Sequence, residues 1–365
     1  MDRARPGRST RVKDDLVRRA GPGSGPGGAP TAIALSPILS ARYRARDLER
    51  IRAAAPGARI VTVSVEGLAD GPLDDVEVML RGWLSSDAFD RILVRAPRLT
   101  WVHSATSGVE RALTPASLDR GIVVTNARGV FSRPIAEYVL MMILAVSRRL
   151  PQLLELQKER TWQPLEGAEL RDVTVGIIGL GSIGRAVATL ATAFGCRVVA
   201  VRRRGDAGGM PSAHDEDDRP LGEATLHRVG GPETLPELLA ESDFIVLAAP
   251  LTPETEEMIN ATTLGMVKPG AWLINVARGR LIDERALLRA LHDGSLGGAV
   301  LDTFRDEPLS PLSSFYDLPN VIVTPHTAWS SGRVLDRSVE LFCDNLRRYA
   351  TAEPLLNVVD PSAGY

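Results

Sequence analysis

The sequence has few cysteines, almost no net charge and no long apolar runs. Its 365 residues contain two cysteines, Cys196 and Cys343. Two cysteines cannot build a disulfide framework, which favours a reducing compartment and a cytoplasmic location. The formal net charge is -2. The chain therefore offers no overall positive charge to attract nucleic acid or an anionic membrane surface, and we expect neither as a partner.

Apolar segments long enough to cross a membrane are also missing. The most apolar run, 139–146, ends at Ser147 and two arginines. It is much shorter than the roughly 20 residues that a bilayer requires. Residues 1–30 are rich in Arg, Gly, Pro and Ser and lack both an apolar period and the apolar core of a secretion signal. They predict a disordered extension.

From residue 32 onward, short apolar runs alternate with helical patterns. This alternation is typical of parallel sheets with helices on both faces, and the length suits two domains. The strands are expected at 32–35, 60–65, 76–80, 100–103, 122–124, 173–178, 197–201, 244–247, 272–276, 298–301 and 321–323. The main helices are expected near 48–55, 135–150, 182–194, 261–266, 284–294 and 333–349, with Ser132 and Asp283 as candidate caps. The helix at 135–150 is apolar on most faces, so we expect it to be buried between domains or subunits.

A glycine-rich turn follows the strand expected at 173–178. Gly179, Gly181 and Gly184 separate this strand from a helical pattern. Glycines let a pyrophosphate approach the backbone, and the N–H groups of the helix N-terminus face that anion. A lone Gly-x-Gly-x-x-Gly is weak evidence. Its position between a strand and a helix, with a second strand at 197–201, predicts a dinucleotide site.

Arg202, Arg203 and Arg204 follow that second strand. An NAD site usually has a carboxylate here, which accepts hydrogen bonds from the ribose hydroxyls. Guanidinium groups instead bind a 2′-phosphate through charge-assisted hydrogen bonds. The sequence thus favours NADP, with NAD as the alternative cofactor and a solvated basic turn as the structural alternative. The acidic stretch at 206–218 predicts a surface excursion beside the cofactor.

Polar residues follow three of the expected strands in the second half of the chain. They are Arg278, then Asp302 and Glu307, then His326. Loops at the carboxyl ends of parallel strands converge on the ligand crevice. We therefore expect a guanidinium, a carboxylate and an imidazole to meet near the glycine turn, and we expect no metal site.

These residue types suit the reduction of a 2-keto acid by hydride transfer. His326 can protonate the developing alkoxide near neutral pH, and Glu307 can hold the other ring nitrogen. Arg278 can bind the substrate carboxylate and polarise its carbonyl. Asp302 is a candidate to orient the nicotinamide carboxamide. Each residue alone has a simpler structural explanation, so this prediction depends on their joint placement.

Five ordered motifs resemble those of the D-isomer-specific 2-hydroxyacid dehydrogenase family. They are G-L-G-S-I-G (179–184), A-A-P-L-T-P-E-T (248–255), N-V-A-R-G-R-L-I-D-E (275–284), L-D-T-F-R-D-E-P (301–308) and T-P-H-T-A-W (324–329). The likeness runs from about residue 32 to 360. It implies two doubly wound Rossmann-like or flavodoxin-like α/β domains: a substrate-binding domain from 31–126 and 331–360, with an NAD(P)-binding Rossmann domain, 127–330, inserted between. Members commonly form homodimers through the helix that corresponds to 135–150.

The resemblance also implies a role for individual residues. It makes Arg278, Glu307 and His326 the catalytic residues. The implied cofactor-binding residues are Gly179, Gly181, Ser182, Ile183, Gly184, Pro250, Thr255, Ala277, Arg278 and Asp302. The charge argument above adds Arg202 and Arg203. The implied substrate-binding residues are Ser107, Gly108, Arg278, His326, Arg81 and Trp329. Two features depart from the family: Arg202 stands where many members have Asp, and the loop at 106–107 lacks an additional glycine.

The sequence therefore predicts an NAD(P)-dependent oxidoreductase acting on CH–OH, which interconverts a small 2-keto acid and a D-2-hydroxy acid. A glyoxylate or hydroxypyruvate reductase is favoured. A phosphoglycerate-type dehydrogenase is one alternative. A dinucleotide-binding scaffold with little turnover, like the family's transcriptional corepressors, is another.

Overall fold

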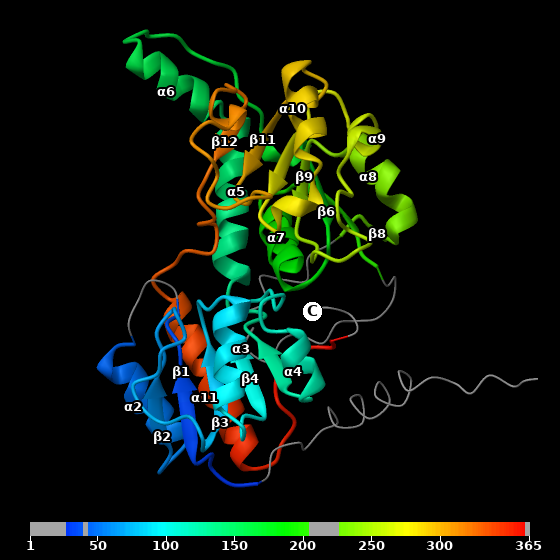
Figure 1. Cartoon of the computed structure of the whole chain (residues 1–365). Coiled ribbons are helices and arrows are strands. Elements are labelled where there is room, and N and C mark those ends of the chain that lie inside the picture. Colours follow the sequence, from blue (N-terminus) through cyan, green and yellow to red (C-terminus); the bar gives the residue numbers. More distant parts are fainter. Residues whose placement is uncertain (1–26, 39–42, 204–225, 362–365) are drawn as a thin grey trace, which may run out of the picture. The chain divides into compact units, whose positions relative to one another are not determined.

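The computed structural model describes residues 27–38, 43–203 and 226–361. The chain divides into two compact units (Figure 1), unit 1 from 1–130 with 332–365 and unit 2 from 131–331. Each unit contains one parallel sheet with helices around it, which confirms the expected pair of doubly wound α/β domains. Most of the extension at 1–30, together with Arg204 and the acidic stretch at 206–218, lies outside the described residues.

Unit 1 contains a five-stranded parallel sheet in the order β2-β1-β3-β4-β5. Its strands are β1 (Ala32–Leu35), β2 (Arg59–Thr62), β3 (Val76–Arg81), β4 (Trp101–Ser104) and β5 (Val123–Asn126). Its helices are α2 (Ala45–Ala54), α3 (Ser86–Arg95), α4 (Pro115–Asp119) and α11 (Val334–Ala350). Successive strand residues point to opposite faces of a sheet. Accordingly, Ile33 and Leu35 pack in a core with residues of α2 and α11, whereas Ala32 and Ala34 pack in a second core with residues of α3.

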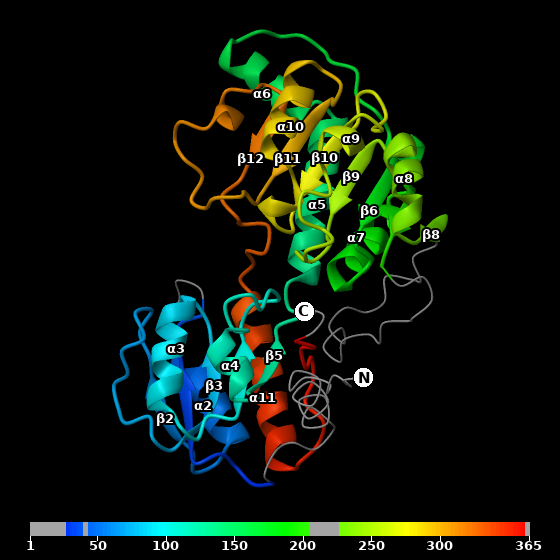
Figure 2. The same cartoon turned by 45° about the vertical axis from the view of Figure 1, so that its right-hand side comes forward.

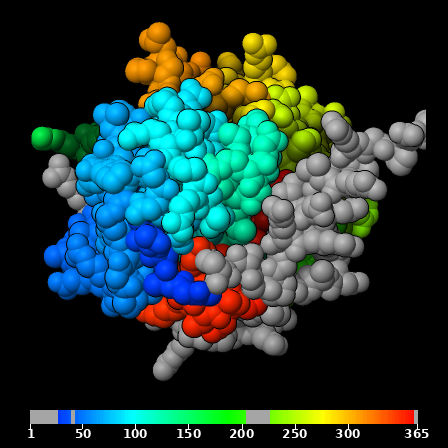
Figure 3. Space-filling model, turned by 60° about the horizontal axis from the view of Figure 1, so that its bottom comes forward, coloured from blue at the N-terminus to red at the C-terminus, as the bar shows by residue number. Residues whose placement is uncertain are grey.

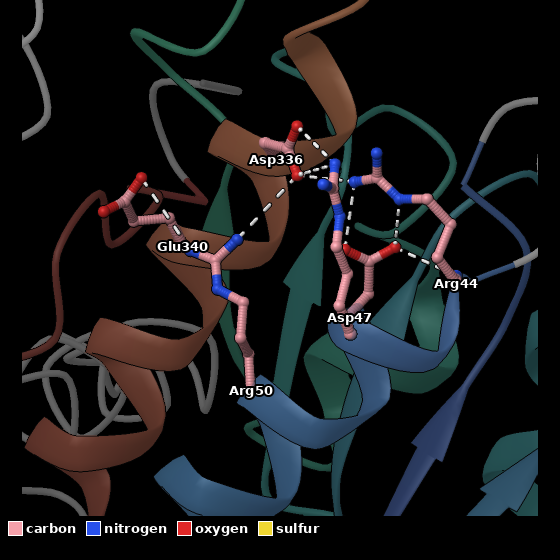
Figure 4. Close-up of polar contacts among 6 residues, drawn as sticks. Arg44, Asp47, Arg50, Asp336 and Glu340 are labelled. Atoms are coloured by element: carbon pink, nitrogen blue, oxygen red, sulfur yellow. Dashed lines mark hydrogen bonds and ion pairs between the residues drawn. The ribbon is translucent and has the colours of Figure 1, made fainter.

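Helix α11 comes from the C-terminal segment of the chain and is tied to α2. Asp336 on α11 accepts a hydrogen bond from Arg44, with 2.5 Å between Nη2 and Oδ1, and Arg44 also donates to the buried carboxylate of Asp47 (Figure 4). The N- and C-terminal segments of this unit also meet at the backbone, because the Gly28 N–H donates to the carbonyl of Ala350. Figure 3 shows the blue N-terminal surface of the unit beside the red C-terminal surface. The N- and C-terminal segments thus build one domain.

Strand β2 is shorter than the apolar run at 60–65 suggested. It ends at Thr62 because the chain turns back: Ser64 N–H donates to the Leu68 carbonyl, and Val63 pairs antiparallel with Ala69. Val65 is exposed.

Unit 2 contains a seven-stranded parallel sheet in the order β12-β11-β10-β9-β6-β7-β8 (Figure 2). Its strands are β6 (Thr174–Ile178), β7 (Arg197–Val201), β8 (Arg228–Gly230), β9 (Phe244–Leu247), β10 (Trp272–Asn275), β11 (Gly298–Leu301) and β12 (Val321–Val323). Its helices are α5 (Ser132–Ser147), α6 (Leu150–Lys158), α7 (Ser182–Ala193), α8 (Leu235–Glu241), α9 (Ala261–Leu264) and α10 (Glu284–His292). Short 3-10 turns lie at η1 (Leu170–Asp172), η3 (Pro232–Thr234), η4 (Gly279–Leu281) and η5 (Ser314–Tyr316).

The strand order of unit 2 reverses direction at β6. The chain moves from β6 outward to β7 and β8, then returns to the other side of β6 with β9. Such a switch point opens a crevice at the carboxyl ends of the two central strands, and ligands bind there in open α/β sheets. The glycine-rich turn after β6 and the loop after β9 both lie at this point.

The start of α5 differs from the expectation that Ser132 caps it. Ser132 is the first helical residue, Phe131 is the N-cap, and the buried Ser132 hydroxyl has no hydrogen-bond partner among the described residues. An N-cap side chain bonds the N–H two or three residues later. Pro134 has no N–H, and the Ile135 N–H already donates to the Phe131 carbonyl. Asp283 does cap α10, as expected, by accepting from the N–H groups of Arg285 and Ala286.

Helix α5 packs against α7 but is not covered on all sides. Met141 on α5 is half-exposed, and α6 contains no buried residue. Among the described residues, no helix combines the length and apolar character that a membrane crossing requires.

Candidate active site

The glycine-rich turn joins β6 to α7, and its three glycines meet different constraints. Gly179 has a φ of +99°, and a Cβ there would lie 2.5 Å from the Ala249 nitrogen. A Cβ at Gly184 would lie 2.1 Å from the Gly179 carbonyl oxygen. A Cβ at Gly181 would meet no atom within 4 Å, and its φ of -82° is open to any residue. The fold therefore requires glycine at 179 and 184, whereas the protein itself does not require Gly181.

Open space at Gly181 fits a dinucleotide that approaches the backbone. Gly181 is the N-cap of α7, and no side chain caps this helix end. Ser182 and Ile183 form the first turn of α7, where N–H groups and the helix dipole favour an anion. The turn therefore has the features that a pyrophosphate requires.

Arg202 and Arg203 follow β7 at the same edge of the sheet. The Arg202 N–H donates to the Gly230 carbonyl, which fixes this backbone beside β8. Hydrogen bonding with Thr252 lowers the pKa of Glu254, and the positive charge of Arg203 lowers it further. Arg203 thus lies close enough to the loop after β9 to act on its charge.

Pro250 and Thr255 belong to that loop. The Thr255 hydroxyl donates to the Pro250 carbonyl over 2.7 Å and accepts from the Thr252 N–H over 2.8 Å. These two bonds fix the conformation of the loop after β9. At Ala249, the same segment of chain packs against Gly179 of the glycine-rich turn.

His326 and Glu307 lie together after β12 and β11. The His326 Nδ1 atom is 2.8 Å from Glu307 Oε2, and the other carboxylate oxygen accepts from the Phe304 N–H over 3.0 Å. Partial burial alone would raise the pKa of Glu307. The hydrogen bonds from His326 and Phe304, with the charges of His326 and Arg278, instead lower it below its ordinary value. Glu307 is therefore a carboxylate at neutral pH.

Arg278 lies beside this pair. It follows β10 and is half-buried, and its side chain donates to the Ala277 carbonyl over 2.8 Å. Asn275 holds the turn by donating to the Arg278 carbonyl and accepting from the Ala277 N–H. A Cβ at the next residue, Gly279, would lie 1.9 Å from the Phe304 carbonyl carbon, so the Arg278 loop packs directly on the segment that leads to Glu307.

Asp302 is buried at the end of β11, with 1% of its surface exposed. Its carboxylate accepts from the Thr324 hydroxyl and from the N–H groups of Thr327 and Ala328. These bonds tie Asp302 to the loop that contains His326 and the half-buried Trp329. Asp302, one of the expected cofactor residues, thus bonds the loop on which His326 lies.

Three further candidates lie at the carboxyl edge of the unit 1 sheet. Arg81 ends β3 and is 3% exposed. It donates to the carbonyls of Gly82 and Leu84, its guanidinium carbon lies 5.3 Å from the centre of the Phe89 ring, and its Nε has no partner among the described residues. Burial, with the charge of Arg111, lowers its pKa to about 10, so it stays protonated at neutral pH.

Ser107 and Gly108 follow β4, the strand next to β3. Thr106 holds this loop by donating to the Gly108 carbonyl over 2.7 Å, and Asn126 donates to the Ser107 carbonyl over 3.0 Å. Arg81, Ser107 and Gly108 thus belong to unit 1. The glycine-rich turn belongs to unit 2, as do Arg278, Asp302, Glu307 and His326.

Two polar residues of unit 2 were not among the sequence candidates. Thr324 contacts Asp302, and Tyr138 of α5 contacts Thr324. Thr324 stands two residues before His326, so its place at the end of β12 could have signalled it. Tyr138 gave only a weak signal, as one of several polar side chains in a helix that is apolar on most faces.

No group of three His, Cys, Asp or Glu side chains in the described part of the chain is arranged to hold a metal ion.

The sequence matches one family model and is similar to known proteins. The model for the D-isomer specific 2-hydroxyacid dehydrogenase, NAD binding domain, matches residues 140–328. A glyoxylate reductase from Thermococcus gammatolerans is 34% identical over 290 residues, which cover 77% of this chain and 81% of the relative.

Solved structures give the same family. A D-isomer specific 2-hydroxyacid dehydrogenase from Xanthobacter autotrophicus Py2, in complex with NADPH and MES, has a TM-score of 0.77 and 30% identity, covering 92% of this chain and 100% of that chain. An NADPH-dependent glyoxylate/hydroxypyruvate reductase from Sinorhizobium meliloti, in complex with NADP and sulfate, has a TM-score of 0.75 and 28% identity, covering 92% and 100%. The chain therefore belongs to the D-isomer-specific 2-hydroxyacid dehydrogenase family, whose members are NAD(P)-dependent oxidoreductases acting on CH–OH.

Proposed function

We propose that this protein reduces small 2-keto acids to D-2-hydroxy acids with a reduced nicotinamide cofactor, with glyoxylate and hydroxypyruvate as its substrates. The observation that carries the proposal is the 2.8 Å pair of His326 and Glu307 beside Arg278, at the carboxyl edge of a sheet that also bears the glycine-rich turn. The glyoxylate reductase among the relatives supports the choice of substrate.

The residues divide the chemistry between them. The bound cofactor supplies the hydride that the carbonyl carbon accepts. His326, protonated on both nitrogens, gives its Nε2 proton to the carbonyl oxygen, and the neutral ring keeps its Nδ1 proton on the bond to Glu307. Arg278 binds the substrate carboxylate and polarises the carbonyl. The Gly179–Gly184 turn, with Pro250, Thr255 and Ala277, holds the dinucleotide.

NADP is the proposed cofactor in preference to NAD. Arg202 and Arg203 stand after β7, where a 2′-phosphate needs cations and a carboxylate would repel it. Two structural relatives were solved with NADPH or NADP. The roles of Ser107, Gly108, Arg81 and Trp329 in substrate binding stay predictions from the family resemblance.

We also propose a homodimer, formed through α5 and α6. An open pocket of about 560 Å³ is lined almost entirely by apolar side chains of α5, α6 and α7. Met141, Leu150, Leu153 and Phe194 at this pocket are 39–51% exposed. Contiguous exposed apolar surface of this kind usually marks an interface. We expect sedimentation to show a dimer for the wild type and a monomer for Met141→Asp. A monomeric wild type would contradict the proposal.

A cytoplasmic location is part of the same proposal. Cys196 and Cys343 are both free and buried, which suits a reducing compartment.

The test is a panel of 2-keto acids assayed with NADPH and with NADH. We expect oxidation of NADPH with glyoxylate, which gives the achiral glycolate, and with hydroxypyruvate, which gives the D-hydroxy acid. We expect a smaller rate with NADH. A preference for a phosphorylated keto acid would instead indicate a phosphoglycerate-type dehydrogenase. Cofactor binding without turnover of any keto acid would indicate a scaffold and contradict the proposed function.

A further inference from the structure

We propose that Tyr138 and Thr324 are positioning residues, whose hydroxyl groups act through Asp302 to set the place of the His326 ring. This inference rests on the proposed function, because it assigns the residues that prepare the proposed acid. All the residues involved belong to unit 2.

The hydroxyl groups form a chain that ends on a buried carboxylate. Tyr138 Oη is 2.6 Å from Thr324 Oγ1, and Thr324 Oγ1 is 2.6 Å from Asp302 Oδ1. A carboxylate only accepts hydrogen bonds, so Thr324 donates to Asp302 and its oxygen accepts from Tyr138. Burial raises the pKa of Tyr138 to about 12, although the bond with Thr324 opposes this rise. Tyr138 is therefore a neutral donor at neutral pH.

Asp302 is the centre around which the 324–328 loop folds. Oδ1 also accepts from the Thr327 N–H over 2.8 Å, and Oδ2 accepts from the Ala328 N–H over 2.9 Å. The backbone carbonyl of Asp302 accepts from the His326 N–H over 2.8 Å. One acidic residue therefore bonds the loop on both sides of His326 and at His326 itself.

The backbone of His326 needs such support. Its φ is +49°, in the left-handed region. That conformation is unfavourable for a residue with a side chain and persists only where the surroundings impose it. If the loop relaxed, the His326 ring would move away from Glu307, because the ring direction follows from this φ. The Asp302 bonds are the contacts that oppose the relaxation.

Tyr138 connects this loop to a helix distant in sequence. It is 9% exposed on α5, and its bond to Thr324 spans 186 residues of sequence. Without Tyr138, Thr324 loses the donor that aligns its hydroxyl proton with Asp302. A purely structural bond would contribute to stability alone, whereas a positioning bond also affects the state of the His326 ring in the folded enzyme.

The test compares Thr324→Val, which removes the hydroxyl at nearly constant shape, with Thr324→Ser, which keeps it. Tyr138→Phe removes only the hydroxyl at the far end of the chain from Asp302, and it tests the inference if Thr324→Val does not fold. Two control variants match these changes. Thr192→Val alters a buried hydroxyl with no partner among the described residues, and Tyr349→Phe alters a hydroxyl that bonds Thr100 in unit 1.

The measurements are kcat with glyoxylate and NADPH, the Kd of NADPH, and the ring ¹⁵N signals of His326. The chain has five histidines, so His326→Gln assigns the signal. We expect kcat to fall about tenfold in Thr324→Val and about threefold in Tyr138→Phe, as the loss of one hydrogen bond allows. We expect the Kd of NADPH to stay within about twofold, the His326 signals to shift, and Thr324→Ser and both controls to resemble wild type.

Unchanged His326 signals and unchanged kcat in Thr324→Val and Tyr138→Phe would overturn the inference. So would an equal loss in Thr324→Ser, since the hydroxyl would then not matter. The ¹⁵N signals do not require turnover. If the wild type reduces no keto acid, the proposed function fails, while the His326 signals still decide whether these hydroxyl groups position the ring.

Discussion

Alanine at Gly181 and at Gly184 should separate cofactor binding from folding. A Cβ at Gly184 would lie 2.1 Å from the Gly179 oxygen, against about 3.4 Å for an ordinary contact. The carbonyl belongs to the backbone and the Cβ position is set by the backbone, so no side-chain rotation can relieve the overlap. Such overpacking costs about 1–3 kcal/mol, which corresponds to a Tm lower by about 3–10 °C for a domain of this size.

Alanine at Gly181 should leave stability nearly unchanged. Its φ of -82° suits alanine, and the added methyl group meets no protein atom. The lower entropy of the unfolded chain contributes about 0.4–1 kcal/mol, and the poorer N-cap costs a similar amount. The methyl group would, however, occupy the space we assign to the pyrophosphate. We expect affinity for NADPH to fall at least about tenfold, equivalent to about 1.4 kcal/mol.

The assay is thermal unfolding of both variants without cofactor, followed by titration with NADPH. Gly184→Ala should unfold at lower temperature, whereas Gly181→Ala should unfold like wild type and bind NADPH weakly. Wild-type affinity in Gly181→Ala would refute the assignment of this turn to the pyrophosphate.

Three other variants test separate parts of the site. Arg202→Asp should replace a charge-assisted bond to the 2′-phosphate with repulsion. We expect kcat/KM for NADPH, divided by kcat/KM for NADH, to fall at least about tenfold; an unchanged ratio would show that Arg202 does not contact the cofactor. Arg278→Lys should raise the KM for glyoxylate about tenfold, because lysine cannot form the bidentate bond to the substrate carboxylate. An unchanged KM would show that Arg278 does not bind substrate. Glu307→Gln should unfold at lower temperature than wild type at pH 7. The pKa of Glu307 is lower in the folded state than in the unfolded chain. The ionised carboxylate therefore stabilises the fold at pH values above the unfolded pKa, and this stabilisation is lost as the pH falls through the folded pKa. A difference in Tm that persisted far below pH 4.5 would contradict this.

Local patterns in the sequence were enough to predict most of the sheet strands. Parallel strands buried on both faces appear as short apolar runs, and β9 and β11 match the expected ranges. Strand β8 was missed because none of its three residues is buried, so no apolar run marks it. Helix α3 was also missed, although the Ser85 cap and the buried Phe89 and Ile92 follow a helical period.

The candidate residues followed from topology, whereas their contacts did not. Loops after parallel strands share one edge, and this rule is enough to place Arg278, Glu307 and His326 in one region from the order of the motifs. The Glu307–His326 bond and the left-handed φ of His326 depend on the path of each loop. The contact of Tyr138 with Thr324 depends on how α5 packs on a distant part of the chain, which no local pattern encodes.

The most direct test of the account is the turnover of His326→Gln beside its affinity for NADPH. Glutamine cannot give up a proton to the alkoxide, so we expect kcat for glyoxylate to fall by at least about a hundredfold. The Kd of NADPH should stay within about twofold, because the glycine-rich turn and Arg202 are untouched. A kcat close to that of wild type would show that the pair of His326 and Glu307 is not the acid of this enzyme.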